Sequence, residues 1–187
     1  MEIRKPRKGG MPVQRAQKAD AAAEREQTLL RLMETYRSDL VRMAYLYLGD
    51  RALAEDATQE TFLKAYKHLA SFRGESSEKT WLMRIAINTC RDLRRSAWFR
   101  RMRRTASLDE ARISSAEDHY RDDTVLRAIM ALPQRDKQVI LLRYYQEMKV
   151  SQIARVLNVP EANAASRLKR ARDKLRQALK GWYFDEE

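Results

Sequence analysis

The chain has 187 residues, of which 44% are apolar and 34% are charged, and its formal net charge is +12. This length suits one or two small domains, and the apolar fraction is sufficient for buried cores. The basic excess predicts a polyanionic partner, with nucleic acid favoured over an anionic membrane surface. No apolar run approaches the roughly 18 residues of a bilayer span. The basic start of the chain also lacks the apolar stretch of a signal peptide, so we expect a cytoplasmic protein that is not inserted into a membrane.

Cysteine and histidine placement argues against a metal or redox centre. Cys90 is the only cysteine, so no internal disulfide can form. His68 and His119 lie far from it in the sequence, and no ligand cluster with metal-binding spacing is present. Nucleophile–base sets and phosphate-cradling glycine loops are also missing from the sequence. We therefore expect no cofactor, no metal and no catalysis.

Every periodic apolar pattern has the helical period, which predicts an all-α fold of two small helical domains joined by a flexible linker. Residues 1–24 carry no apolar stripe and predict a disordered basic tail. The first domain is expected over residues 25–97, and Gly49 and Asp50 should separate its first two helices. The first helix repeats apolar residues at steps of three and four: Leu29, Met33, Tyr36, Leu40, Met43 and Tyr47.

The second helix, ALAEDATQETFLKAY, is an acidic island in a basic protein. Glu55 and Asp56 are adjacent and do not share a helix face, and no histidine is near, so catalysis or metal binding is disfavoured. An acidic, partly apolar helix is better suited to dock on a basic protein surface.

A polar loop is expected over Ser71–Lys79, followed by a third helix from Thr80 to about Ser96. Aromatic rings and a guanidinium beside small hydroxyls suit unstacked bases of single-stranded DNA. The alternative is that the two aromatic residues belong to the core. The residues concerned are Phe72, Arg73, Ser76, Ser77, Thr80 and Trp81.

The third helix has two unlike faces. One face is apolar, and the other carries Arg84, Asn88, Arg91, Asp92 and Arg95. Such a polar face is often only solvated. An asparagine able to read a base edge and the dense arginine stretch beyond it favour nucleic acid.

A linker over 98–121 and a second helical domain over 122–182 are expected next. Within the second domain, Ser151 should cap a helix whose stripe includes Ile153 and Leu157, and Asn158–Pro160 breaks the period. The helix that follows is strongly basic. This arrangement is typical of a helix-turn-helix, with a helical hairpin that presents a solvated face as the alternative.

Three segments together resemble the extracytoplasmic-function sigma factors of the bacterial sigma-70 family. They are LAEDATQETFLKAY, FRGESSEKTWLMRIAINTCRDLRR and ALPQRDKQVILLRYYQEMKVSQIARVLNVPEANAASRLKRARDKL. They follow in the family's order and cover about residues 27–181. The resemblance implies a promoter-specificity subunit of RNA polymerase. Region two would bind core polymerase and open the minus-ten element, and region four would read the minus-thirty-five element.

The resemblance also implies site residues and partners. Polymerase docking falls on Asp56, Gln59, Glu60 and Phe62. Capture of a flipped base falls on the loop Phe72–Lys79, and minus-ten contacts on Arg84, Asn88, Arg91 and Asp92. The reading helix corresponds to 161–174, with Asn163, Ser166, Arg167, Lys169 and Arg170 as contacts. The implied partners are core RNA polymerase, through its clamp and flap regions, promoter DNA and an anti-sigma factor.

The reading helix departs from the family at its start. Where the family typically has Gly-Thr-Val-Lys, this chain has Ala162-Asn163-Ala164-Ala165. Ala165 cannot make the polar contact of the family's lysine, and Asn163 is the candidate replacement. Helix formation is unaffected, because alanine is a good helix former.

Two other functions are compatible with the residues alone. A stand-alone helix-turn-helix regulator would dimerise to match two half-sites and bind DNA without polymerase. A small nucleic-acid enzyme would cleave or join strands by itself.

Overall fold

The computed structural model describes residues 11–96 and 123–180, and all regular structure in these ranges is helical. The N-terminal half contains α1 (Met11–Leu48), α2 (Arg51–His68), the short helix η1 (Leu69–Ser71) and α3 (Glu78–Arg95). The C-terminal half contains α5 (Asp123–Ala131), α6 (Gln134–Ile140), η2 (Leu141–Tyr145), α7 (Val150–Leu157) and α8 (Glu161–Ala178). The all-α prediction is confirmed. The predicted linker, 98–121, lies outside the described residues.

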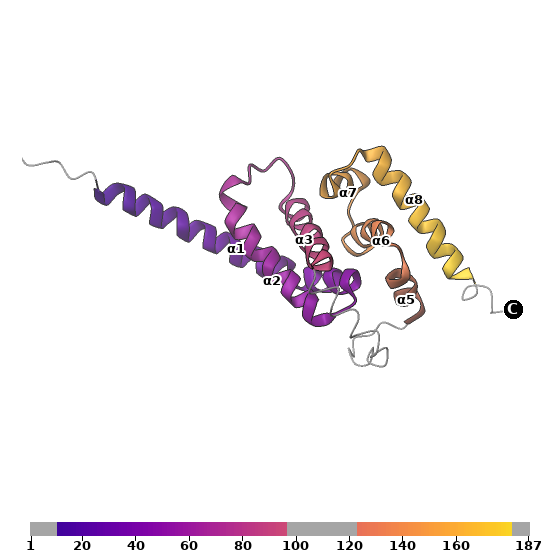
Figure 1. Ribbon diagram of the computed structural model, residues 1–187. Coiled ribbons are helices and arrows are strands. Elements are labelled where there is room, and N and C mark those ends of the chain that lie inside the picture. Colours follow the sequence, from indigo (N-terminus) through magenta and orange to yellow (C-terminus); the bar gives the residue numbers. More distant parts are fainter. Residues whose placement is uncertain (1–10, 97–122, 181–187) are drawn as a thin grey trace, which may run out of the picture.

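Helix α1 begins at Met11, so residues 11–24 are helical and the prediction of a disordered tail is wrong for them. The first turns of α1 extend away from the rest of the molecule (Figure 1). Alanine, glutamine, lysine and glutamate dominate this stretch and are among the best helix formers. An apolar stripe in the sequence indicates only those helices that bury one face against a neighbouring element. The start of α1 instead continues a helix whose later turns are anchored.

The turn between α1 and α2 follows the predicted signals. Gly49 has φ +76°, a left-handed conformation that glycine adopts without strain, and it ends α1. Asp50 Oδ1 accepts a hydrogen bond from the Leu53 amide at 2.8 Å and so caps α2. Helix α3 then packs on both α1 and α2, and buries Leu82 and Ala86.

In the C-terminal half the predicted cap of α7 is wrong. Lys149 precedes the helix, and its amide donates to Gln152 Oε1 at 2.9 Å, while Ser151 lies inside the helix. The predicted break after α7 is confirmed. Asn158 has φ 52° and ends α7, and α8 begins directly after Pro160.

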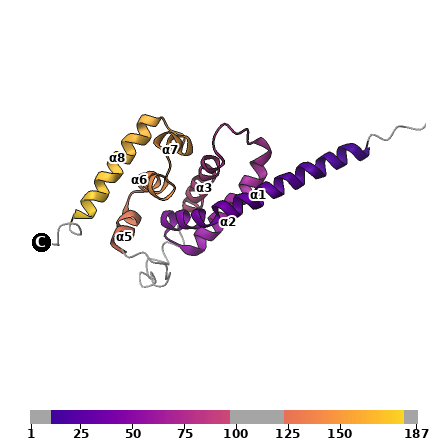
Figure 2. The ribbon, with the colours of Figure 1, turned by 180° about the vertical axis from the view of Figure 1, so that it is seen from behind.

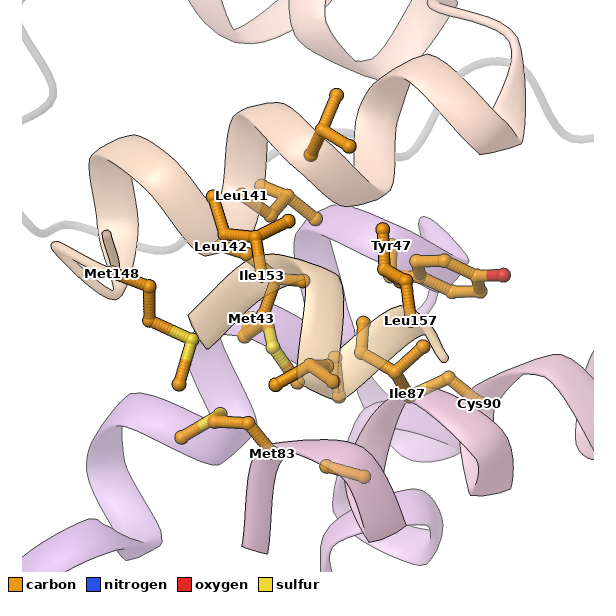
Figure 3. Packing of buried hydrophobic residues seen from close by; sticks show 14 of the residues in the cluster. Met43, Tyr47, Met83, Ile87, Cys90, Leu141, Leu142, Met148, Ile153 and Leu157 are labelled. Carbon is orange, nitrogen blue, oxygen red and sulfur yellow. The ribbon is translucent and has the colours of Figure 1, made fainter. Parts of the chain in front are cut away.

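The two halves share one apolar core. Helix α3 packs against α7, and α1 packs against α5, α6 and η2. Figure 3 shows Met43, Met83 and Ile87 of the N-terminal half gathered around Met148 and Ile153 of the C-terminal half, and all five are at most 1% exposed. The sequence predicts two helical domains. The structure adds that their apolar faces meet.

Polar contacts also cross this shared core. Gln138 Nε2 donates to the Tyr47 hydroxyl at 3.0 Å, and Gln146 Nε2 donates to the Asp39 carbonyl at 3.3 Å. Both glutamines are buried, which makes the loss of a partner expensive. Cys90 of α3 lies in the same core at 1% exposure, and burial raises the pKa of its thiol to about 12.

We expect Tyr47→Phe to destabilise the protein by about 1–3 kcal/mol, because the buried Gln138 amide loses its hydrogen-bond acceptor. Urea denaturation followed by circular dichroism measures the change. The control is Tyr144→Phe on an exposed ring, where a change within about 0.5 kcal/mol is expected. Equal stability of the two variants would show that this hydrogen bond does not hold the halves together.

Candidate polymerase and nucleic-acid interfaces

The loop formed by residues 72–77 is held at both ends. At its start, the Phe72 amide donates to the Leu69 carbonyl at 3.1 Å. The rings of Phe72 and Trp81 then pack with their centroids 4.8 Å apart and their planes tilted by 34°. Both rings are half-buried, and Trp81 also packs against the core. The aromatic pair therefore fastens the loop to the first turns of α3 and leaves part of each ring accessible.

Ser77 and Thr80 build the other end of the loop. Ser77 Oγ accepts from the Thr80 amide at 3.2 Å and lies 2.9 Å from the Thr80 hydroxyl, so it caps α3. Helix α3 consequently starts at Glu78. The sequence predicts a start two residues later, at Thr80. Thr80 is only 1% exposed, and its hydroxyl is used in this cap. It therefore does not fit the predicted DNA contact.

An ion pair ties the start of α3 to α1. Two nitrogens of Arg31 donate to the two carboxylate oxygens of Glu78, at 2.9 and 2.6 Å. The hydrogen bond and the charge of Arg31 hold the pKa of Glu78 below its ordinary value, and Glu78 raises the pKa of Arg31. Both groups are partly exposed, so the pair contributes little to overall stability. Its bidentate geometry does fix an orientation.

The outward face of α3 is basic. Arg84, Asn88 and Arg95 are exposed and Arg91 is half-buried, at the helical spacing that the sequence predicts. Asp92 is also exposed, but its carboxylate lies 3.9 Å from Lys64 Nζ of α2. The structure therefore places Asp92 at the boundary with α2.

An acidic groove runs between α2 and α3. Lys64 lies within it, 3.7 Å from the Glu60 carboxylate and 3.3 Å from the Thr89 hydroxyl. Leu63 is 56% exposed there and places an apolar side chain among the carboxylates. Phe62, in contrast, is only 4% exposed and packs in the core, so it does not fit the predicted polymerase contact. The groove is lined by Asp56, Gln59, Glu60, Leu63, Lys64, Thr89, Asp92, Leu93 and Ser96.

Helices α7 and α8 form the predicted helix-turn-helix. Ile153, Val156 and Leu157 of α7 are buried, as are Leu168 and Ala171 of α8. The predicted contacts of α8 point outward: Asn163, Ser166, Lys169 and Arg170 are exposed, and Arg167 is half-buried. Opposite views place α8 on the side of the C-terminal half away from α1 (Figures 1 and 2).

The departure at the start of α8 has a structural counterpart. Ala164 is 1% exposed, so the position of the family's valine packs beneath the helix and here holds a smaller side chain. Ala165 is exposed and Asn163 is exposed beside it. A salt bridge of 2.5 Å between Lys174 and the buried Asp136 holds α8 on α6.

Comparison with known proteins gives the family. The family model described as "Sigma-70 region 2" matches residues 32–100, and the model described as "Sigma-70, region 4" matches residues 122–175. The ECF RNA polymerase sigma-E factor of Salmonella typhimurium LT2 is 31% identical over 175 residues, which cover 86% of this chain and 88% of the relative. The chain belongs to the sigma-70 family, in its extracytoplasmic-function group.

Other sigma factors agree in sequence and fold. The ECF RNA polymerase sigma factor SigW of Bacillus subtilis is 28% identical over 166 residues, covering 80% of this chain and 87% of that protein. Among solved structures, CnrH in complex with the cytosolic domain of CnrY has a TM-score of 0.63 at 25% identity, and covers 87% of this chain and 94% of that one. RpoE with the anti-sigma factor NepR from Bartonella quintana has a TM-score of 0.59 at 22% identity, covering 83% and 96%.

In this sigma factor the sequence prediction missed Leu63, Lys64 and Thr89 of the acidic groove. Helical spacing from Asp56 through Gln59 and Glu60 points to position 63, so the exposed leucine was detectable. The contributions of α3 were not, because they depend on how α2 and α3 pack. In the part of the chain that the structure describes, no helix is both long and apolar enough to cross a membrane, and no cluster of side chains suits a metal ion.

Proposed function

We propose that this sigma factor binds core RNA polymerase and directs it to promoters, where region two opens the minus-ten element and region four reads the minus-thirty-five element. The observation that carries the proposal is the ordered pair of sigma regions, matched over residues 32–100 and 122–175. Each region presents an exposed basic helix face, on α3 and on α8. The net charge of +12 suits a protein that neutralises DNA phosphates.

Region two would act on separated strands. Taking a base out of the duplex stack costs a few kcal/mol, and capture of that base offsets the loss. The loop 72–77 offers the accessible parts of two packed rings, the exposed Arg73 and the hydroxyl of Ser76, which suit an unstacked base. The arginines on the outward face of α3 would hold the phosphates of the same strand, and Asn88 would contact a base edge.

Region four would act on intact duplex. A helix-turn-helix inserts its second helix into the major groove, where base edges present distinct donor and acceptor patterns. On α8 the exposed Asn163, Ser166, Lys169 and Arg170 share the side opposite the buried Leu168. Because Ala165 lacks the family's lysine, Asn163 would supply the first polar contact of this helix.

The acidic groove would dock on the clamp of core polymerase. Its carboxylates, around the exposed Leu63, suit a partner surface with basic residues and an apolar patch. Asp92 lies in this groove, paired with Lys64, so we assign it to docking in preference to DNA contact.

An anti-sigma factor would hold this protein inactive until a signal arrives. Support comes from the similar fold of RpoE, solved in complex with the anti-sigma factor NepR. A stand-alone regulator is disfavoured, because the matched regions are those of polymerase subunits.

The decisive experiment is transcription by purified core polymerase with and without the full-length protein, on fragments of the source genome. We expect initiation at discrete sites only when the protein is present, with permanganate-reactive thymines near each start site. Absence of protein-dependent initiation on every fragment would overturn the proposal. DNA binding by a tight dimer without polymerase would instead support a stand-alone regulator.

Glu60→Lys tests the docking groove. We expect the affinity for core polymerase to fall at least about tenfold, because a like charge replaces an attractive one in the interface. Within α2 the change removes the Glu60–Lys64 pair and sets two lysines four residues apart, and each of these effects costs about 0.2–0.5 kcal/mol. The control is Glu34→Lys, the same charge reversal on the exposed surface of α1. Unchanged co-purification of the Glu60 variant would remove the groove from the interface.

Arg170→Ala tests the reading helix. If Arg170 binds a phosphate, the slope of log affinity against log salt for a promoter duplex should flatten by about one unit. The control is Arg37→Ala on α1, which removes the same charge outside the helix-turn-helix. A slope equal to that of the control would show that Arg170 makes no phosphate contact.

A further inference from the structure

The middle of the loop 72–77 depends on its ends for its orientation. Gly74 has φ +72°, and a Cβ added there would meet no atom within 4 Å. Arg73 and Glu75 on either side of it are exposed. The contacts that locate the loop are the Phe72 amide and the Phe72–Trp81 ring pair at its start and the Ser77 cap at its end. A small rotation of the first turn of α3 would therefore turn the whole loop.

The Arg31–Glu78 pair opposes such a rotation. Glu78 is the first residue of α3 and directly follows the capping Ser77. Arg31 lies on α1 beside Leu32, which is fully buried and fixes that part of α1 in the core. Two parallel hydrogen bonds at 2.9 and 2.6 Å restrict both the distance and the angle between the groups, which a single contact does not.

The ring pair needs the same restraint. Phe72 stands at the start of the loop, whereas Trp81 is on α3, one turn after Glu78. Their separation of 4.8 Å is kept only while α3 keeps its direction relative to the start of the loop. The start of the loop follows α2, and α2 packs on α1. The ion pair joins α3 to this same helix α1.

We propose that Arg31 and Glu78 are positioning residues, which orient the loop 72–77 for base capture without contacting DNA themselves. The inference rests on the proposed function of region two. It adds Arg31 of α1, and it gives Glu78, which lies within the segment Phe72–Lys79, a positioning role in place of a DNA contact. The expected loss on breaking the pair lies in the recognition of one captured base, and not in general DNA affinity or folding.

The experiment measures how much the captured base contributes. Full-length protein with core polymerase is bound to forked promoter DNA taken from a start site mapped with the wild-type protein. An abasic scan along the non-template strand finds the position whose base matters most. The readout is the ratio of affinities for DNA with and without that base. We expect a wild-type ratio of roughly tenfold, the scale of one stacked base.

Arg31→Ala and Glu78→Gln should each lower this ratio at least about threefold, while affinity for the abasic DNA stays near that of the wild type, because the base-dependent stacking is what the pair supports. Arg31→Lys should give an intermediate ratio, because an ammonium lacks the planar fork that grips both oxygens. Exchanging the charges, as Arg31→Glu with Glu78→Arg, should recover part of the ratio. The matched control, Arg37→Ala on the same helix, should leave it unchanged.

The outcomes separate the two proposals. A wild-type ratio well above one that stays unchanged in Arg31→Ala would overturn the positioning role and leave the proposed function intact. Equal losses on both DNAs would also overturn it, because they would indicate a general structural defect. Failure of the wild-type protein to direct initiation at any site would instead count against the function of region two itself.

Discussion

Helix α3 is buried on two sides at once, and the rest of the structure is arranged around this constraint. Leu82 and Ala86 face the core with α1 and α2, whereas Met83 and Ile87 meet α7 (Figure 3). A helix with a period of 3.6 residues then has a single free side. That side carries Arg84 and Asn88. The direction in which the polar face of α3 is exposed is thus set by packing on the other two sides.

The same helix separates two kinds of surface. Along its border with α2, carboxylates surround Lys64 and an exposed leucine. On its free side, Arg84, Arg91 and Arg95 recur, and Asp92 lies at the border with α2. The acidic groove and the basic face of α3 are therefore adjacent but distinct surfaces. The two faces therefore differ in sign of charge within one small domain.

Sequence patterns predicted most local features, except the cap of α7 and the start of α3, and missed what depends on packing. Gly49, Asp50 and Asn158 act at helix ends as their chemistry requires, and the amphipathic stripes gave the correct fold class. The helix over residues 11–24 was missed because it has no apolar face to detect. Thr80 looked available, yet the Ser77 cap and the core enclose it. Two contacts join distant parts of the chain, and no local sequence pattern predicts them. They are Tyr47–Gln138 and Arg31–Glu78. The predicted DNA and polymerase contacts remain predictions, although most of them lie on accessible faces.

The reactivity of Cys90 depends on whether the two halves are packed together. Its thiol lies in the shared core, and a pKa of about 12 keeps it protonated near neutral pH, so alkylating reagents that require the thiolate have almost nothing to attack. Any separation of the halves that brings solvent to this side of α3 restores an ordinary, reactive sulfhydryl. Because the chain has no other cysteine, the rate at which Cys90 is alkylated measures the rate of that opening. Mass spectrometry follows this reaction without an engineered probe.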